Sequence, residues 1–338
     1  MKNLSIIFQG PAASDDGTLC PQVYAHLRRT RQAFPAAEII LSTWSMPPER
    51  MAWWRVSLEV IRVRLVMSSD PGSQAYTIKK STYITNLNRL LISSQAGLAH
   101  ATQPLAVKLR TDSGLTNRKL VALLNQQVLC EAPTVPRDPA YRIFRSRVIN
   151  ADWYARDARG SLPYLYHPGD ILLAGYTEDL RLFFSAPPAG AELFRPSERP
   201  GLSCPWRYVP EQWFWLNAIH KTTGEWVYHG NFDHDEQHIV ASEQSYLANF
   251  VPYSARSLGF SWPKYWRSYP FRGLFSIYTH RRWQRLAART QGLSVHRFTG
   301  AVDEMLTTIW RGGYRLRNVF LRYSPIRRIA MRLFVHRR

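Results

Sequence analysis

Polar, small or turn-forming residues follow four apolar, strand-like segments in the first 115 residues of this 338-residue chain. Such residues can bind a phosphate or a sugar when loops bring them together, because they offer charges, amides and close approach to the backbone. Loops that follow parallel strands meet at one edge of the sheet, so these four predict a nucleotide or sugar site. The alternative is that each Gly and Pro only ends a strand. The loops are Gln9-Gly10-Pro11, Ser42-Thr43-Trp44, Ser69-Asp70-Pro71-Gly72 and Arg110-Thr111-Asp112.

Lys108 and Arg110 alternate with Leu109 and therefore point to the same face of a predicted strand. Two neighbouring cations on one face repel each other unless an anion lies between them. That anion is either a bound diphosphate or a structural Asp or Glu. The chain contains neither GxGxxG nor GxxxxGK[ST], so the usual dinucleotide site and P-loop are not supported.

Two further carboxylates could act as a base toward an attacking hydroxyl. Asp170 ends the run His167-Pro168-Gly169-Asp170, at a predicted junction between a turn and a strand. Glu211 follows Pro210 at the start of an aromatic helix. An acid at a helix N-terminus is also favoured by the helix dipole alone. The sequence leaves both carboxylates as candidates, with neither ahead.

A rival metal site is suggested by residues 228–238, which contain Asp233-His234-Asp235. His234 and His238 lie four residues apart, a spacing that puts two ligands on one face of a helix. A zinc enzyme would show a better-defined third ligand. A polar surface turn is therefore the favoured interpretation of this segment.

Alternating short strands and helices must position these residues. Apolar runs predict strands over 4–8, 38–44, 60–66 and 105–110, and helical spacing predicts helices over 21–34 and roughly 77–99. This alternation indicates an α/β fold with a mostly parallel sheet flanked by helices.

Composition and charge divide the chain in two. The apolar fraction of 45% suffices for a large core, and no apolar run approaches the length of a membrane span. The whole chain has a net charge of +20. Residues 257–338 hold 17 Lys and Arg but only two acids, and so carry most of this excess. We therefore expect a nearly neutral body, 1–256, and a basic extension, 257–338, that seeks phosphate in a membrane or in nucleic acid. Three distant cysteines argue against a disulfide framework and indicate a reducing cytoplasm.

The basic extension contains two patterns that suit a membrane surface. Residues 262–285 interleave aromatic and basic side chains, which could stack on nucleic-acid bases or anchor in the lipid headgroup layer. Because no nucleic-acid motif accompanies them, the membrane is favoured. Ser324-Pro325 then begins a predicted amphipathic helix, which either lies on an anionic membrane or packs on the body. Its apolar stripe is Ile326, Ile329, Ala330, Leu333 and Phe334, and its basic residues are Arg327, Arg328 and Arg332.

The chain resembles the WavE family of lipopolysaccharide synthesis proteins over roughly residues 3–270. The resemblance rests on Phe8-Gln9-Gly10-Pro11, Ser42-Thr43-Trp44 and Lys108-Leu109-Arg110-Thr111-Asp112. Asp70-Pro71-Gly72, Asn88-Arg89, Glu211-Gln212 and Lys264-Tyr265 add to it in chain order. It implies a glycosyltransferase with a GT-A-like, Rossmann-like fold that uses a nucleotide-sugar donor. The implied acceptor is a lipid-linked glycan or lipopolysaccharide core at the cytoplasmic face of the inner membrane.

The resemblance also implies a set of site residues. Asp112 takes the place of an acid of the Asp-x-Asp motif, which holds Mn²⁺ or Mg²⁺ against the donor diphosphate. Arg110 replaces the first acid and can itself neutralise phosphate, so such a cation is weakly bound or unnecessary. Asp170 or Glu211 is expected to act as the catalytic acid or base. The expected donor-binding residues are Gln9, Gly10, Thr43, Asp70, Asn88, Arg89, Lys108, Arg110 and Asp112, with Asp112 also the metal ligand.

Two other functions compete with glycosyl transfer. A phospho-sugar or nucleotidyl transferase would use the same phosphate-binding loops. A non-catalytic basic adaptor would bind RNA or a membrane through the extension. Polar loops at four strand ends favour an enzyme over the adaptor, and the partners expected are the sugar donor, the glycan acceptor and an anionic membrane rather than nucleic acid.

Overall fold

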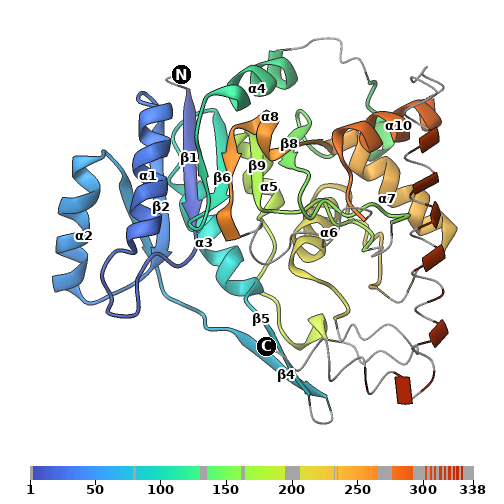
Figure 1. Ribbon diagram of the computed structural model, residues 1–338, viewed down its shortest axis with the longest axis horizontal. Helices are drawn as coiled ribbons and strands as arrows, with labels where there is room; N and C mark the ends of the chain where they lie inside the picture. Colours follow the sequence, from blue (N-terminus) through green and yellow to red (C-terminus); the bar gives the residue numbers. More distant parts are fainter. Residues whose placement is uncertain are drawn as a thin grey trace.

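A computed structural model describes the chain at residues 3–78, 81–129, 135–160, 164–194, 206–231, 233, 235–264, 276–291 and at single positions between 301 and 329. Its centre is a seven-stranded sheet in the order β10-β8-β9-β6-β1-β2-β3 (Figure 1). These strands are β1 Leu4–Gln9, β2 Glu38–Trp44, β3 Arg64–Ser68, β6 Leu105–Arg110, β8 Val148–Ala151, β9 Leu172–Tyr176 and β10 Phe250–Tyr253.

One strand of this sheet runs against the others. β3, β2, β1 and β6 are parallel to their neighbours, and β8 is parallel to β10. β9 lies between β6 and β8 and is antiparallel to both. The expected α/β fold with a mostly parallel sheet is confirmed. Because β9 is reversed, its start lies beside the end of β6, where Leu172 pairs with Leu109.

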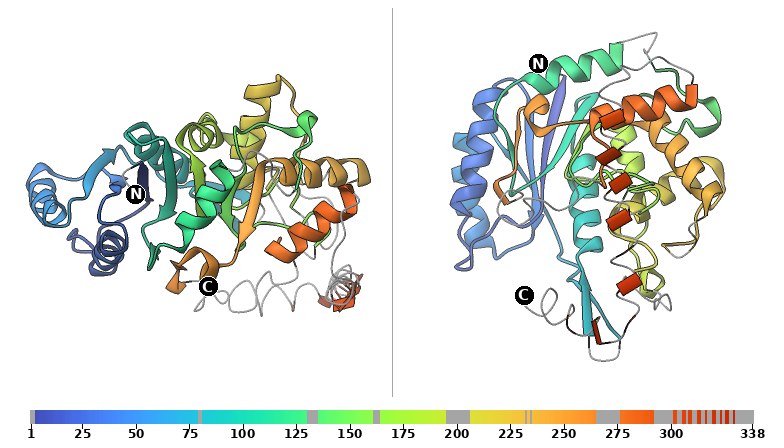
Figure 2. Two further views of the ribbon diagram at one scale, coloured as in Figure 1. Left: turned by 90° about the horizontal axis from the view of Figure 1, so that it is seen from above. Right: turned by 45° about the vertical axis from the view of Figure 1, so that its right-hand side comes forward.

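Helices cover both faces of the sheet. α3 and α5 lie on one face and α1 and α4 on the other, as the view along the sheet in Figure 2 shows. The helices are α1 Pro21–Ala33, α2 Pro48–Val60, α3 Leu87–Ala99, α4 Lys119–Leu129, α5 Thr177–Phe183, α6 Pro210–Thr223, α7 Glu236–Asn249, α8 Ala255–Leu258 and α10 His280–Gln291. Short 3₁₀ turns, η1 Pro139–Tyr141 and η2 Ala191–Leu193, lie between them.

Buried strands form the core, and every residue of β1 is buried. α3 lies unusually close to this strand, because a Cβ atom on Gly97 would come 2.5 Å from the Ile7 side chain. Any larger residue at 97 would push the helix off the sheet. The position of α3 matters for the site, since its residues pack beneath the ends of β1 and β2.

Two predicted elements were wrong. The helix expected over 77–99 is shorter, and the residues before it form a projecting hairpin of β4 Gln74–Ile78 and β5 Ser81–Thr85. This stretch is rich in Thr, Tyr and Ile, which favour strands over helices. The third strand begins at Arg64 rather than at residue 60, because Val60 ends α2.

The start of the basic extension is built into the body. β11 Phe260–Ser261 pairs with β7 Gly114–Leu115, and α10 packs against α7 and β10. Trp262, Tyr278 and Trp283 are buried, so these three aromatic side chains belong to the interior and not to a lipid-facing surface. The middle of the aromatic and basic pattern, 265–275, lies outside the described residues. No described helix is long and apolar enough to cross a membrane.

Candidate active site

The carboxyl ends of the parallel strands bring several predicted site residues to one edge of the sheet. Gln9 ends β1 and Arg110 ends β6, and the two are paired in register. Asp170 joins them there, since it stands two residues before the reversed strand β9. The register therefore explains why residues 9, 110 and 170, far apart in sequence, lie together.

Lys108 and Asp170 form a buried ion pair at this edge. The ammonium Nζ lies 3.0 Å from Asp170 Oδ2 and 2.7 Å from the Asp170 main-chain oxygen, and both side chains are at most 2% exposed. Burial lowers the pKa of Lys108, while the Asp170 carboxylate opposes that change. The anion beside Lys108 is thus a structural acid, the second of the two alternatives above, and Lys108 holds Asp170 in place.

Glu211 stands at the first turn of α6, next to His167. Its Oε2 lies 3.4 Å from His167 Nε2, and its side chain is 16% exposed. Burial, and then repulsion by Asp170, raise the pKa of Glu211 to about 7. The helix N-terminus alone would favour the charged form, so burial outweighs the dipole here. A carboxyl that titrates near neutrality is suited to proton transfer.

The imidazole beside Glu211 is neutral. Burial, with the nearby Arg156 guanidinium, lowers the pKa of His167 to about 3. His167 and Glu211 therefore form a contact between an uncharged ring and a carboxyl group, and not a salt bridge.

The turn that presents Asp170 is tightly constrained. Gly169 has a φ of +78°, and a Cβ atom there would lie 3.2 Å from the backbone of residues 154 and 155. Tyr154 and Tyr166 also have positive φ values, 67° and 53°. Bulky residues rarely adopt this conformation, and such strain is concentrated at functional sites.

Arg110 and Asp112 form the more exposed half of the site. Their two contacts measure 3.1 and 3.2 Å, and each side chain is 32% exposed. Burial pushes the pKa of Asp112 upward, but Arg110 and a hydrogen bond from Trp262 hold it below its usual value. Asp112 is thus ionised near neutrality, in contrast to Glu211. The Arg110 guanidinium also lies 5.5 Å from the Trp262 ring.

The residues around Asp112 do not make a cation site on their own. The described part of the chain has no group of three His, Cys, Asp or Glu side chains that could hold a metal. Both oxygens of Asp112 already face Arg110. In the rival segment Asp233-His234-Asp235, Asp235 caps α7 by accepting from the His238 amide, and His234 lies outside the described residues.

Three donor-site predictions fall at the ends of β1 and β2. Gln9 is buried and donates to Ser93 Oγ at 2.8 Å. Gly10 has a φ of +128°, and a Cβ atom there would approach Thr111 Oγ1 to 3.2 Å. Thr43 is buried within β2. These residues pack at the carboxyl ends of β1 and β2, and their role in donor binding stays a prediction.

Asp70, Asn88 and Arg89 make local contacts. Arg89 forms an ion pair with Asp70, and Asn88 exchanges two hydrogen bonds, 2.8 and 2.9 Å, with the backbone of Ala189. The Arg89–Asp70 ion pair has a small desolvation cost, because both side chains are about one-third exposed. Asn88 and Arg89 stand in the first turn of α3 and Asp70 in the loop after β3, so these contacts tie the helix to neighbouring loops.

Sequence reasoning missed two acid–base groups near this edge. His26 on α1 interacts electrostatically with Asp112, and burial lowers its pKa. Asp152 follows β8, and burial raises its pKa to about 7. The rule about strand ends would have found Asp152 if residues 148–151 had been interpreted as a strand. No sequence signal connects His26 with Asp112.

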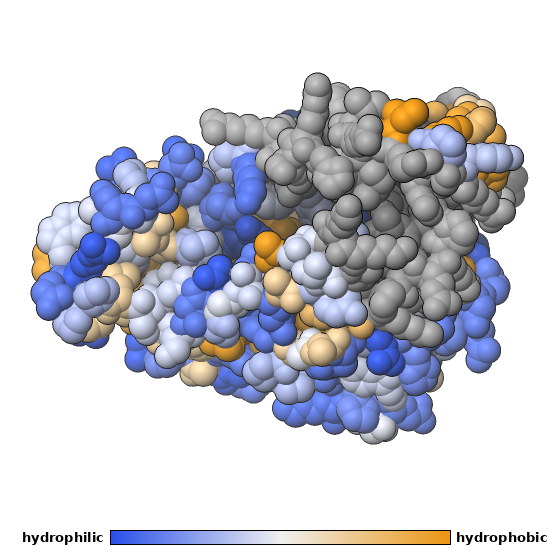
Figure 3. Space-filling view, turned by 90° about the horizontal axis from the view of Figure 1, so that it is seen from below, coloured by the Kyte–Doolittle hydropathy of each residue, from blue (hydrophilic) through white to orange (hydrophobic). Residues whose placement is uncertain are grey.

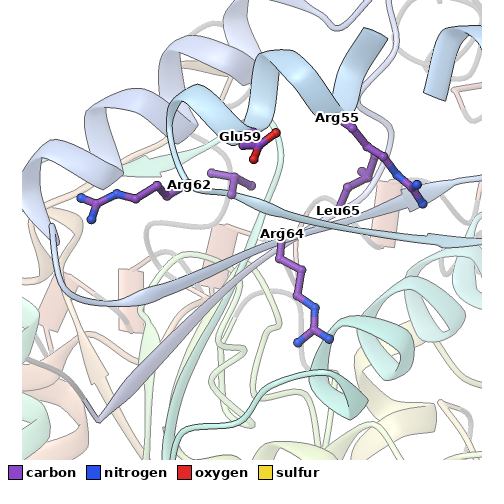
Figure 4. Close-up of a pocket in the computed structure, with 6 residues that line it drawn as sticks. Arg55, Glu59, Arg62, Arg64 and Leu65 are labelled. Carbon is purple, nitrogen blue, oxygen red and sulfur yellow. The ribbon is translucent and has the colours of Figure 1, made fainter. Parts of the chain in front are cut away.

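A hollow of about 450 Å³ lies elsewhere, at the opposite end of β3 (Figure 4). It is lined by Arg55, Glu59, Arg62, Val63, Arg64 and Leu65. A second hollow of about 300 Å³ shares Arg62 and Arg64 with it. Both hollows lie at the amino ends of the strands, so neither belongs to the candidate site at the carboxyl ends.

An α/β sheet whose carboxyl edge carries both a near-neutral carboxyl and an ionised Arg–Asp pair is a site of the kind found in group-transfer enzymes. Residues 4–295 match the family described as WavE lipopolysaccharide synthesis, and the chain belongs to that family. The resemblance drawn from the sequence is confirmed. Among curated proteins, no similar sequence is found.

Solved structures of transferases are similar to this chain at low identity. The mannosyltransferase PcManGT from Pyrobaculum calidifontis, in complex with GDP-Man and Mn²⁺, is 12% identical, with 99% of this chain and 88% of that one covered and a TM-score of 0.36. The galactosyltransferase LgtC, with donor and acceptor sugar analogues, is 10% identical over 89% and 99%, with a TM-score of 0.34. The glycosyltransferase GlyE from Streptococcus pneumoniae is 14% identical over 55% of this chain, which spans 36% of that protein, with a TM-score of 0.25.

Proposed function

We propose that the protein is a glycosyltransferase with a GT-A-like fold that moves a sugar from a nucleotide-sugar donor to a lipopolysaccharide core or related surface glycan. The observation that carries the proposal is that two carboxyls at one sheet edge have pKa values shifted in opposite directions. Glu211 has its pKa raised to about 7, whereas Asp112 has its pKa lowered. Two acids held in different protonation states can serve as base and as electrostatic partner in one reaction.

Each group then has a role. Glu211 takes the proton from the acceptor hydroxyl, whose oxygen forms the new bond to the anomeric carbon of the donor. The bond to the nucleoside diphosphate breaks, and Arg110, held by Asp112, neutralises the charge that develops there. Asp170 and Lys108 position the base and set its environment. Among the described residues, a divalent cation near Asp112 would find fewer than three His, Cys, Asp or Glu ligands, so the diphosphate and water would complete its coordination.

A panel of nucleotide sugars and free nucleotides, each with and without Mn²⁺ or Mg²⁺, tests this proposal. A ligand that binds the folded protein raises its melting temperature by mass action. Stabilisation by a nucleotide sugar supports glycosyl transfer. Stabilisation by a sugar phosphate or a nucleoside triphosphate alone would support the phospho-sugar or nucleotidyl transferase. No stabilisation by any member of the panel would contradict every enzymatic proposal.

Replacing Asp112 by Asn should lower the turnover of the folded protein by about 10²–10³-fold. The substitution removes the charge that orients Arg110 and barely changes the volume of the side chain. Glu178→Gln is the control, because Glu178 is an exposed acid just after β9, at the edge of the sheet opposite Asp112. Turnover and melting temperature should be measured together, and normal turnover in a stable Asp112→Asn protein would remove Asp112 from the site.

We further propose that the C-terminal tail, 301–338, holds the enzyme on the cytoplasmic face of an anionic membrane. Its described positions are helical at most sites and expose ten large apolar side chains, while Figure 3 shows a mostly hydrophilic surface with apolar residues gathered at one end. Spacings of three, four and seven residues support a single stripe. Residues 311–338 hold nine Lys or Arg and no acid. The ten are Val302, Met305, Leu306, Ile309, Leu316, Val319, Phe320, Tyr323, Ile326 and Ile329.

Within the helix predicted from Ser324, Ile326 and Ile329 are described, whereas Ser324, Arg327, Arg328 and 330–338 lie outside the described residues. Deleting residues 312–338 should leave a folded protein that no longer sediments with anionic liposomes at low salt. Each basic residue near such a surface contributes on the order of 1 kcal/mol. Sedimentation of the truncated protein as complete as that of the full chain would show that the membrane contact lies elsewhere.

A further inference from the structure

The loop 152–156 leaves β8 at the carboxyl edge of the sheet, beside the candidate site. Its start is fixed by the Asp152 amide, which donates to the Tyr253 main-chain oxygen at 3.0 Å. Its end is fixed by the Arg156 amide, which donates to the His167 main-chain oxygen at 2.9 Å. The loop is therefore anchored at both ends to segments of the same sheet edge.

Tyr154 stands in the middle of this loop in a backbone conformation that disfavours it. Its φ is +67°, in the left-handed region that costs a bulky residue energy. Tyr166 has a similar φ of +53°, but its ring is buried and packs against Tyr228, so core packing accounts for it. The Tyr154 side chain is only half-buried. Its strained backbone thus holds an aromatic ring at the surface of the site.

The neighbours of the Tyr154 ring come from both halves of the candidate site. The centroid of the Tyr154 ring lies 6.2 Å from that of Trp262. The same Trp262 ring lies 5.5 Å from the Arg110 guanidinium, in the half that contains Asp112. The Arg156 guanidinium lies 5.0 Å from the Tyr154 ring.

Arg156 belongs to the half of the site that holds Glu211. Its guanidinium donates to Ser276 Oγ at 2.9 Å. Burial sets the main shift in the pKa of His167 and of Glu211, and the nearby charge of Arg156 lowers both values. Trp262 and Tyr154 therefore connect the two halves of the site.

The order of these groups matches the order of the atoms in a sugar transfer. Under the proposed function, Arg110 faces the diphosphate that leaves, and Glu211 faces the hydroxyl that attacks. The anomeric carbon takes part in both the bond that breaks and the bond that forms, so the sugar must lie between these two groups. Tyr154 contacts both halves and is the aromatic residue expected beside that sugar.

We propose that Tyr154 is a binding residue for the sugar that is transferred, with the C–H face of a pyranose against the exposed part of its ring. The inference rests on the proposed function, from which it takes the places of the diphosphate and the acceptor. An aromatic face carries partial negative charge and attracts polarised C–H bonds. Sugars with mostly equatorial hydroxyls offer such a face, so the donor is expected to carry one of these.

The test uses the full-length protein and calorimetric titration with UDP-, GDP- and dTDP-sugars, each compared with its own nucleoside diphosphate. Tyr154→Asn removes the ring, and Asn tolerates the left-handed backbone, so the melting temperature should not fall. Its affinity for the diphosphate should equal that of wild type. Its affinity for the matching nucleotide sugar should fall about tenfold. Tyr154→Phe keeps the ring and should bind both as wild type does.

Tyr176→Asn is the matched control. The Tyr176 ring is half-buried and lies 4.0 Å from the Arg145 guanidinium, but it stands at the opposite edge of the sheet, where it pairs with Leu105. Tyr176 also precedes α5, a position where Asn is favoured. Both affinities of this variant should equal those of wild type.

The possible outcomes separate Tyr154 from the reaction itself. If Tyr154→Asn weakens the diphosphate and the nucleotide sugar equally, or weakens neither, the proposal is wrong while glycosyl transfer stands. An equal loss of nucleotide-sugar affinity in Tyr154→Phe would assign the contact to the hydroxyl and also overturn it. If no nucleotide sugar binds wild type, glycosyl transfer is contradicted and the role of Tyr154 with it.

Discussion

Replacing Glu211 by Gln should lower the turnover number by about 10²–10⁴-fold while donor affinity stays unchanged. The amide keeps the shape of the side chain and the contact with His167, but it cannot accept the proton of the acceptor hydroxyl. Turnover is measured with saturating donor and acceptor, and donor affinity by thermal shift. If the Gln variant lost donor binding instead, Glu211 would be a binding residue and not the base.

The pH profile should carry the signature of the same carboxyl. A base works only when deprotonated, and the pKa of Glu211 is raised to about 7. Wild-type turnover should therefore be low at pH 6, rise through pH 7 and level off above it. The raised pKa also makes stability fall as pH rises from the ordinary pKa of 4.5 to about 7, because the unfolded state releases this proton first. Between pH 5 and 8 the free energy of unfolding of wild type should thus fall relative to that of Glu211→Gln.

Asp170→Asn separates the roles of the two carboxylates. Asp170 raises the pKa of Glu211 by repulsion, so its neutralisation should move the rise in the pH profile to lower pH. Residual turnover with a shifted profile identifies Asp170 as a positioning residue. A complete loss of turnover in Asp170→Asn, together with an active Glu211→Gln, would reverse the assignment.

Replacing Lys108 by Met should lower the free energy of unfolding by about 3–5 kcal/mol. Lys108 and Asp170 are 0 and 2% exposed, so removing the ammonium leaves a buried carboxylate without its counter-charge. Urea denaturation measures the change. The expected loss is large because the remaining charge is stranded, and not because the pair itself is strongly stabilising.

Two controls accompany Lys108→Met. Glu178→Gln breaks the exposed pair with Arg181 and should change stability by no more than about 1 kcal/mol. Lys108→Met/Asp170→Leu removes both charges and should recover most of the loss. A single variant as stable as wild type would mean that Asp170 accepts a proton at no cost, which contradicts the ion pair.

The sequence predicted the strands better than the contacts between them. The strand 105–110 was placed correctly because Leu105, Ala106, Val107 and Leu109 are apolar and buried, so the sequence carries the signal of a buried strand. The alternation of Lys108 with Leu109 predicted which face of the strand Lys108 is on, but not the acid that pairs with it. That acid, Asp170, lies 62 residues away and is brought to Lys108 by the reversed strand β9. Helical spacing over 77–99 could not be distinguished from a hairpin followed by a helix.

The candidate site shows the same difference between what local sequence predicts and what packing decides. Positions at strand ends and at the start of α6 follow from local pattern, so Asp112, Asp170 and Glu211 could be proposed from the sequence. The protonation state of Glu211 depends on burial and on Asp170, which are properties of packing. The shifted pKa values of His167 and Asp152 likewise follow from burial, which no local spacing reveals.

The order of strands in the sheet also sets the order in which a growing chain can fold. β1, β2, β3 and β6 are neighbours and are complete once residue 110 has been synthesised. β8 is made before β9 but pairs only with β9 and β10, so it must wait for residues 172–176 to leave the ribosome. Glu211 and β10 emerge later still. A nascent chain therefore holds four finished strands with an unpaired edge at β6, and that edge needs protection until β9 arrives.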